Sequence, residues 1–237
     1  MRVVALVGLL AGCDGVFGLI EIRTNEDALD TAGLVAHYRL DETSGTMYAD
    51  SSGLGHIATC VDPRCPDAVP GHVSGAARFD GTDDRVDVAG GVDFDGSAAF
   101  TVALWMNAEQ LAGCPASKVS GTAGDNSWQL CLTSTGLLMF WANSPDGIPL
   151  AARAPISTNS WHHVAMRWDG RARVLSIDGV DATELATTMI TFDGGPILIG
   201  ADADMGVTLD PFRGLIDEVR IYSRALSTAE ITMLAQQ

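Results

Sequence analysis

Five tryptophans are the side chains of this sequence best suited to hold a ligand, because an exposed indole can stack on the flat face of a sugar ring. A tryptophan in a strand belongs more often to the core, since it buries a large apolar area. We therefore expect at least three of the five to be core residues. Trp141 has the best claim to a ligand role, with Asn143 and Asp146 in the polar loop that follows it. The other four are Trp105, Trp128, Trp161 and Trp168.

The spacing of the polar residues argues against an enzyme. Glycoside hydrolysis needs two carboxyl groups that face one sugar, about 5–10 Å apart, but the neighbouring Asp217 and Glu218 would point to opposite faces of a strand. The adjacent His162 and His163 cannot chelate one metal for the same reason, so we expect one core-facing, hydrogen-bonded imidazole and one exposed imidazole. The sequence has no Gly-x-Ser-x-Gly nucleophile motif and no glycine-rich phosphate loop after a strand. We predict that the protein is not an enzyme.

The N-terminus is typical of a targeting segment. Arg2 precedes the apolar run Val3–Leu10, which is too short to span a bilayer. The next four residues, Leu10-Ala11-Gly12-Cys13, resemble a bacterial lipobox, in which Cys13 would carry a lipid and begin the mature protein. An ordinary signal peptide with a nearby cleavage site is the alternative. We predict a signal peptide over residues 1–12, a tether over 13–32, and a lipid-anchored or secreted protein of the cell envelope.

The cysteine count supports export from the cell. Of five cysteines, Cys13 would carry the lipid, which leaves an even set of four for two disulfides. Four cysteines allow three pairings, and we predict Cys60–Cys65, which closes a tight loop, and Cys114–Cys131, which ties two segments that flank strands. Free buried thiols are the alternative. A zinc site is less well supported, because no second cysteine pair or histidine cluster accompanies the Cys-x4-Cys spacing.

Composition limits the fold and the partners. The formal net charge of −16, from 30 acidic and 14 basic residues, argues against binding to nucleic acid, which needs a basic footprint. Hydrophobic residues make up 47% of the 237 residues, charged residues only 19%, and there are 26 glycines. This balance favours many short strands joined by turns around a sizeable core.

Strand patterns recur along the whole chain. In Phe100–Met106, alternation puts Phe100, Val102 and Leu104 on one face of a strand. More than eight such runs, separated by Gly and Asp turns, predict a sandwich or barrel. The clearest helix signal is the capping box Ser227–Glu230, which predicts a short helix over residues 228–235. Further strands are expected at Leu34–Leu40, Arg85–Val88, Trp128–Leu132, Leu137–Trp141, Trp161–Trp168, Val174–Ile177, Ile197–Gly200 and Leu215–Tyr222.

Several segments, taken in order, resemble laminin-G-like domains of the concanavalin-A-like jelly-roll kind. The similar segments are Tyr38–Gly45, Phe79–Asp84, Trp161–Ala165, Ile177–Gly179 and Phe212–Tyr222. Each match is weak alone, but together they span roughly residues 34–234. The resemblance implies an all-β, two-sheet antiparallel jelly-roll sandwich with a short C-terminal helix, over residues 33–237, whose first and last strands are neighbours.

The resemblance also implies a structural calcium ion. Related domains often hold Ca²⁺ with carboxylates from the opening loop and from the closing acidic dipeptide, which points to Asp41, Asp50 and Asp217 in this sequence. The alternative is that Asp41 and Asp50 cap turns, while Asp217 pairs with an arginine. A second acidic loop, Asp202–Gly206, superficially resembles an EF-hand, but its glycine falls at the wrong position and we expect a solvated turn.

Two functions remain open at this level. In the first, the protein is an extracytoplasmic binding module that recognises carbohydrate or a glycoprotein and is stabilised by Ca²⁺. In the second, it is a structural or protein-interaction domain of the cell envelope with no small ligand. The partners are then carbohydrate or an envelope or extracellular protein, with the membrane reached through the lipid anchor only. The fold does not choose between them, because function depends on sites grafted onto folds.

Overall fold

The computed structural model describes residues 31–88, 99–118, 127–145, 147–186, 189–192, 195–204 and 207–237. Cys13 and Asp146 lie outside these residues, as do the expected signal peptide and all but the last two residues of the expected tether. The lipidation site and the domain boundary at residue 33 therefore stay predictions. Among the described residues, none of the helices has both the length and the apolar character needed to cross a membrane.

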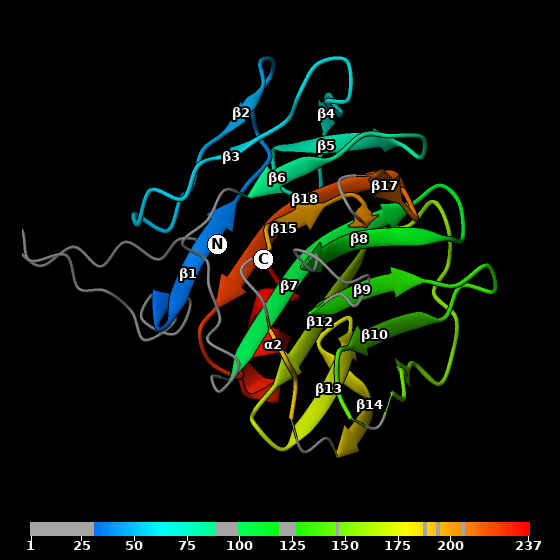
Figure 1. Cartoon of the computed structure of the whole chain (residues 1–237). Helices are drawn as coiled ribbons and strands as arrows, with labels where there is room; N and C mark the ends of the chain where they lie inside the picture. The colour runs from blue at the N-terminus through cyan, green and yellow to red at the C-terminus, as the bar shows by residue number, and fades with distance from the viewer. Residues whose placement is uncertain are drawn as a thin grey trace, which may run out of the picture.

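The first sheet, sheet A, contains eight antiparallel strands within the described residues (Figure 1). Its strand order is β14-β13-β12-β7-β18-β5-β4, and β1 also pairs with β18. The strands are β1 (Leu34–Tyr38), β4 (Asp67–Pro70), β5 (Gly75–Asp80), β7 (Phe100–Ala108), β12 (His162–Trp168), β13 (Ala172–Ile177), β14 (Val180–Ala186) and β18 (Arg213–Tyr222).

The second sheet, sheet B, also contains eight strands in the described part of the chain, in the order β11-β10-β9-β8-β15-β6-β3-β2. A small hairpin, β16 (Asp202–Asp204) with β17 (Val207–Leu209), forms a separate two-stranded sheet. The strands of sheet B are β2 (Met47–Tyr48), β3 (Ala58–Thr59), β6 (Val86–Val88), β8 (Gly113–Lys118), β9 (Trp128–Leu132), β10 (Leu138–Ala142), β11 (Leu150–Ala151) and β15 (Ile197–Ile199).

The hydrophobic core lies between the two sheets, which makes the molecule a sandwich. Strand β7 shows how alternation builds it: Phe100, Val102 and Leu104 are fully buried in the main core cluster, as the sequence predicts. Strands β9 and β10 contribute Trp128 and Phe140 from the opposite sheet to the same cluster. The predicted all-β jelly-roll class is confirmed.

The C-terminal helix α2 (Thr228–Leu234) begins at the expected capping box, since Glu230 N donates to Ser227 Oγ and Glu230 Oε2 accepts from Ser227 N. Its apolar side chains Ile231 and Leu234 pack on Ala103 and Tyr222, which point out of sheet A on the side away from the core. The helix thus covers part of the outer face of sheet A. The first and last strands, β1 and β18, lie side by side as the resemblance implies (Figure 1).

Two regions differ from the sequence expectations. Strand β8 lacks the alternation of a half-buried strand, because all six of its residues are buried. The segment expected to be a solvated turn, Asp202–Gly206, instead contributes strand β16, whose Asp202 and Ala203 are buried against sheet B. The expectation is therefore wrong for Asp202 and Ala203, while Met205 and Gly206 lie outside the described residues.

Candidate functional site

One row of side chains crosses the outer face of sheet B, from β10 to the edge strand β2. The strand registers place these residues directly opposite one another, so they share the face that points away from the core. From β10 to β2 the row consists of Trp141, Gln129, Ser117, Leu198, Asp87, Thr59 and Met47.

Trp141 is the exposed aromatic side chain of this row. It is 42% exposed, whereas Phe140, the preceding residue of β10, is fully buried in the core. Three of the five tryptophans are buried, as predicted: Trp128 and Trp168 lie in the core between the sheets, and Trp105 is buried on the outer face of sheet A. Trp161 is intermediate. Trp141 therefore presents an indole to solvent from a rigid strand.

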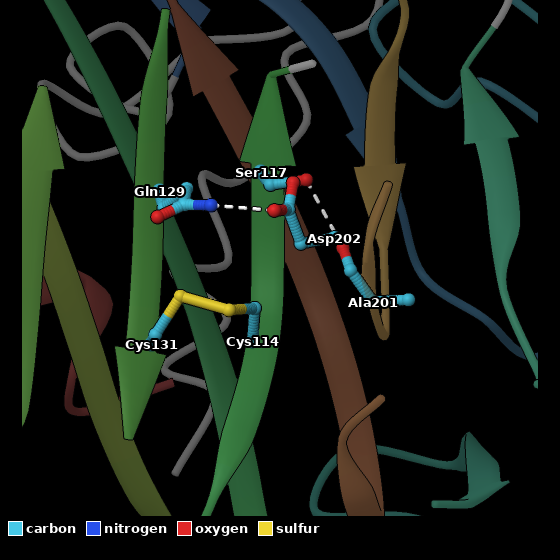
Figure 2. The surroundings of a disulfide bond; sticks show 6 residues. All are labelled: Cys114, Ser117, Gln129, Cys131, Ala201 and Asp202. Atoms are coloured by element: carbon cyan, nitrogen blue, oxygen red, sulfur yellow. Dashed lines mark hydrogen bonds between the residues drawn. A yellow bond between two sulfur atoms is a disulfide. The ribbon is translucent and has the colours of Figure 1, made fainter. Parts of the chain in front are cut away.

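Gln129, the cross-strand neighbour of Trp141, is held in place by the hairpin β16–β17. Its Nε2 donates to Asp202 Oδ2 at 2.5 Å, and Ser117 Oγ donates to Ala201 O at 3.0 Å (Figure 2). Ala203 packs on Leu198 in the middle of the row. The hairpin thus covers the centre of the outer face and fixes polar groups beside Trp141.

A disulfide joins two strands of the same face. Cys114 of β8 is bonded to Cys131 of β9, next to the Gln129–Asp202 contact (Figure 2). The other pair, Cys60–Cys65, closes the short loop between β3 and β4. Both predicted pairings are confirmed.

The other predicted ligand contacts follow Trp141. The backbone of Asn143 is fixed on both sides, since its N donates to Ser127 O at 3.1 Å and its O accepts from Thr191 N at 2.7 Å. Its side chain is half-buried. Asp146 lies outside the described residues, so the role of the loop tip stays a prediction.

Two of the three predicted calcium ligands meet at the turn over residues 71–75. Asp41 Oδ1 accepts from Gly75 N at 2.7 Å, and Asp217 Oδ2 accepts from Val73 N at 2.8 Å. A Cβ on Gly71 would lie 2.0 Å from Gly75 O and 2.7 Å from Asp217 Oδ2, so these two oxygens are close neighbours. The chain brings carboxylates 176 residues apart to one short turn of backbone carbonyls.

Asp50 has a different role. Its two carboxylate oxygens accept from His37 N, Ser52 N, Ser52 Oγ and His56 N, at 2.7–3.0 Å. These backbone hydrogen bonds lower the pKa of Asp50 in spite of its partial burial. Four donors occupy the carboxylate, which therefore closes its own loop and does not reach the turn over residues 71–75.

Asp217 is the electrostatically unusual member of the set. Its side chain is fully buried, and within the described residues its Oδ1 has no hydrogen-bond partner. Burial raises the pKa of Asp217 to about 7, and the neighbouring Glu218 carboxylate contributes to the increase. Glu218, not Asp217, makes the arginine pair, with Arg220 at 2.7 Å. A buried carboxylate oxygen without a donor is costly unless a cation or water satisfies it.

The outer face of sheet A carries a second row, His163–Trp105–Asp217, across β12, β7 and β18. His72 stacks on Trp105 with ring centroids 3.7 Å apart and so covers the row. His163 is 1% exposed, its Nδ1 has no partner within the described residues, and burial lowers its pKa to about 4. His162 lies on the core-facing side of β12 with Val164 and is the hydrogen-bonded imidazole, as expected. The expected exposed imidazole is not found, because His163 points out of sheet A but is covered.

A further acidic group was not singled out from the sequence. The carboxylate oxygens of Asp80, Asp83 and Asp84 lie within 4.8 Å of one another. Asp84 Oδ2 accepts from Asp80 N and Asp80 Oδ1 accepts from Thr82 N, both within the turn between β5 and β6. These hydrogen bonds account for two of the carboxylates as turn caps.

Known families and solved structures share this architecture. A family model described as "Concanavalin A-like lectin/glucanases superfamily" matches residues 80–232. Domain 4 of AbnA, an extracellular arabinanase from Geobacillus stearothermophilus solved in complex with arabinotriose, is 24% identical, with a TM-score of 0.66 over 86% of this chain and 98% of that chain. No curated protein matches the sequence.

Two more distant structures share the fold. The ligand-binding domain of botulinum neurotoxin serotype D, solved in complex with N-acetylneuraminic acid, is 14% identical, with a TM-score of 0.65 over 88% of this chain and 52% of that chain. A Trypanosoma rangeli sialidase mutant that displays trans-sialidase activity is 16% identical, with a TM-score of 0.66 over 87% of this chain and 33% of that chain. This chain thus spans only about half and a third of those two proteins. With the family model matching well over half of its residues, the chain belongs to the concanavalin A-like lectin/glucanase superfamily.

Proposed function

We propose that this protein binds carbohydrate on the outer face of sheet B, with Trp141 as the stacking platform. The observation that carries the proposal is the 42% exposure of Trp141 on a strand whose neighbouring residues are packed in the core. An indole held by a rigid strand loses little conformational freedom on binding and offers a large apolar contact area. Gln129 lies directly opposite Trp141, where its amide can hydrogen-bond to sugar hydroxyls.

The fold relatives support the same class of ligand, since two of them were solved with a sugar bound. The role fits a protein of the cell envelope, carried by the lipid anchor that we predict at Cys13. A protein-interaction domain with no small ligand is the competing function. Val207 and Leu209 on the hairpin are exposed beside the same face and would suit a protein partner as well.

A glycan array probed with the whole protein tests the proposal. We expect binding to one group of related glycans, and Trp141→Ala should lower the affinity for them by tenfold or more. Leu54→Ala is the matched control, because Leu54 is an exposed apolar side chain on a distant loop. No binding to any glycan would favour the protein-interaction function. Equal glycan binding by Trp141→Ala and Leu54→Ala would overturn Trp141 as the stacking platform.

The calcium ion is the second part of the proposal. The buried Oδ1 of Asp217, which has no partner among the described residues, supports it, because a cation at the turn over residues 71–75 would satisfy this oxygen together with Asp41 and a backbone carbonyl. Calcium prefers six to eight oxygen ligands at about 2.3–2.6 Å, so carbonyls and water would complete the shell. We keep Asp41 and Asp217 as ligands and assign Asp50 to its own loop.

Melting curves of metal-stripped protein test the ion. A ligand that binds only the folded state at a hundredfold excess over its Kd stabilises that state by about 2.7 kcal/mol, so millimolar calcium should raise the Tm by several degrees. Asp217→Asn should abolish the increase, whereas Asp50→Asn should lower the Tm and still respond to calcium. Identical curves in EDTA and in calcium would exclude the site.

A further inference from the structure

Three polar side chains from separate segments meet at one end of sheet A. Ser157 belongs to the loop between β11 and β12, His162 is the first residue of β12, and Asp178 lies in the turn between β13 and β14. Ser157 Oγ is 2.8 Å from His162 Nε2, and His162 Nδ1 is 2.9 Å from Asp178 Oδ2. The imidazole therefore bridges a hydroxyl and a carboxylate through its two different nitrogens.

The direction of the hydrogen bonds follows from the groups involved. An ionised carboxylate can only accept, so a neutral imidazole between the two groups carries its hydrogen on Nδ1 and donates it to Asp178. Nε2 is then left as the acceptor for the hydroxyl hydrogen of Ser157. A nucleophile, a base and a carboxylate that orients the base stand in this relation in hydrolytic triads, which are recognised by geometry and not by sequence order.

The backbone holds each member in place. Asp178 and Gly179 have φ values of 52° and 80°, as in the two-residue hairpin turns that favour Asp-Gly. Asp178 Oδ1 also accepts from His163 N at 3.0 Å, which leaves Oδ2 aimed at His162.

The serine loop is anchored on both sides of Ser157. Ile156 N donates to Gly136 O at 3.0 Å, and Asn159 N donates to Ala108 O at 2.9 Å. The hydroxyl thus projects from a segment that is fixed before any ligand arrives, which is the preorganisation that a nucleophile requires.

The three residues line a pocket of about 480 Å³. The His162 side chain is 16% exposed, while Ser157 is exposed, so the base is shielded and the hydroxyl is accessible. Pro155, Ile156, Ile177 and Val180 give the pocket an apolar wall. Arg153 also lines the pocket and brings a positive charge to it.

We propose that Ser157, His162 and Asp178 form a catalytic triad that hydrolyses esters of short acyl chains. Ser157 Oγ attacks the ester carbonyl carbon and its proton passes to His162 Nε2, so that a new C–O bond forms. The bond to the alcohol then breaks, and the alcohol leaves with the proton from His162. Water attacks the acyl group in the same way, which releases the carboxylic acid and restores the Ser157 hydroxyl. The apolar wall holds the acyl chain, and no co-reactant other than water is needed.

This activity is independent of sugar binding, which uses the outer face of sheet B. It also runs against the expectation of a non-enzymatic protein, which rested on the missing nucleophile and phosphate-loop motifs and on carboxylates that do not face one another. Ser157 and Asp178 lie 5 and 16 residues from His162, so the three residues do not form a short sequence motif.

The experiment uses the whole chain with p-nitrophenyl acetate and p-nitrophenyl butyrate, and a fluorophosphonate probe read by peptide mass spectrometry. We expect protein-dependent hydrolysis and an adduct on the peptide that contains Ser157. Ser157→Ala should reduce hydrolysis to the buffer rate and abolish the adduct. His162→Gln should also reduce hydrolysis to the buffer rate, although Ser157 and Asp178 are unchanged in this variant. Ser160→Ala, an exposed serine of the same loop, is the matched control and should leave both signals unchanged.

The opposite results are equally clear. Hydrolysis at the buffer rate by the folded wild-type protein, with no adduct, would overturn the proposal. Equal hydrolysis by the wild type and by Ser157→Ala, with both variants melting cooperatively, would show that the three side chains only tie the loop to the hairpin.

Discussion

Trp105 and Trp141 occupy equivalent positions with opposite outcomes. Each points away from the core on a strand whose neighbouring residues line it, yet Trp105 is 7% exposed and Trp141 is 42% exposed. His72 stacks on Trp105, and helix α2 packs on the same outer face of sheet A. On the outer face of sheet B, the hairpin β16–β17 covers Leu198 and leaves Trp141 uncovered.

Alternation along a strand assigns a side chain to one face of the sheet, but it does not decide whether that side chain reaches solvent. Whether an outward residue is structural or able to bind depends on which distant segment lies over it. The outer face of sheet A, the covered face, is stabilised by packing. The outer face of sheet B is called the uncovered face because its Trp141 end is open, although the hairpin lies over its centre, and it is held by a disulfide and by hydrogen bonds to the hairpin. The two faces should therefore respond differently to the same kinds of substitution.

The largest effect is expected on the covered face. Trp105→Ala removes a buried indole and the surface on which His72 stacks, and such truncations cost about 3–5 kcal/mol of unfolding free energy. Urea unfolding measures the loss, and glycan binding by the folded fraction should be unchanged. A loss below about 1 kcal/mol would mean that the turn over residues 71–75 does not pack on Trp105 in solution.

The stability of the uncovered face should depend more on the disulfide Cys114–Cys131. The double substitution Cys114→Ser, Cys131→Ser opens a loop with a sequence separation of 17 and should cost about 3 kcal/mol, because the unfolded chain regains conformational freedom. The matched control, Cys60→Ser with Cys65→Ser, opens a separation of only 5 and should cost less. The reverse order in urea unfolding would contradict this assignment.

The pH dependence of stability probes the turn on the covered side. The pKa of Asp217 is raised from 3.8 to about 7, so the folded state holds this proton more tightly and the metal-free protein gains stability as the pH falls through 7. We expect a gain on the order of 1 kcal/mol between about pH 8 and pH 6.5 in EDTA.

Asp217→Asn should abolish this gain. Below pH 6.5 the buried His163 works in the opposite direction, because its pKa is lowered to about 4 and the unfolded state then takes up the proton. A metal-free wild type with the same pH profile as Asp217→Asn would show that Asp217 is not the titrating group.

The smallest change in stability is expected at Trp141. Trp141→Ala removes an exposed indole and should alter the unfolding free energy by less than about 0.5 kcal/mol, as surface substitutions do. Trp141→Ala should instead lower glycan affinity, whereas Trp105→Ala should lower stability and leave glycan binding unchanged. A destabilisation as large as that of Trp105→Ala would show that the uncovered face is packed in solution.

Local patterns in the sequence predicted much of the fold. The alternation of Phe100, Val102 and Leu104, the capping box at Ser227 and the two cysteine pairs are short-range signals, and the structure bears each of them out. Strand β8 could not be recognised, because it is buried on both faces and so shows no alternation.

The sites needed long-range information. Asp41 and Asp217 accept from the same turn, residues 71–75, only because that turn leads into β5 and β5 pairs with β18. Asp50 could not be told from a metal ligand by its residue type, since its role depends on the four donors around it. Ser157 and Asp178 reach His162 through a loop anchor and a strand register. Neither leaves a trace in local spacing.

The position of β18 in sheet A has a consequence for the synthesis of the protein. This strand, residues 213–222, lies between β7 and β5 and also pairs with β1. Until it emerges, those strands expose unpaired edges, which are templates for pairing with other chains. Sheet A therefore cannot complete its strand pairing until residues 213–222 have been made, and the partly folded chain exposes edges that favour aggregation until then. A nascent chain stalled before Arg213 would lack β18, an internal strand of sheet A, and so β5 and β7 would have no strand between them.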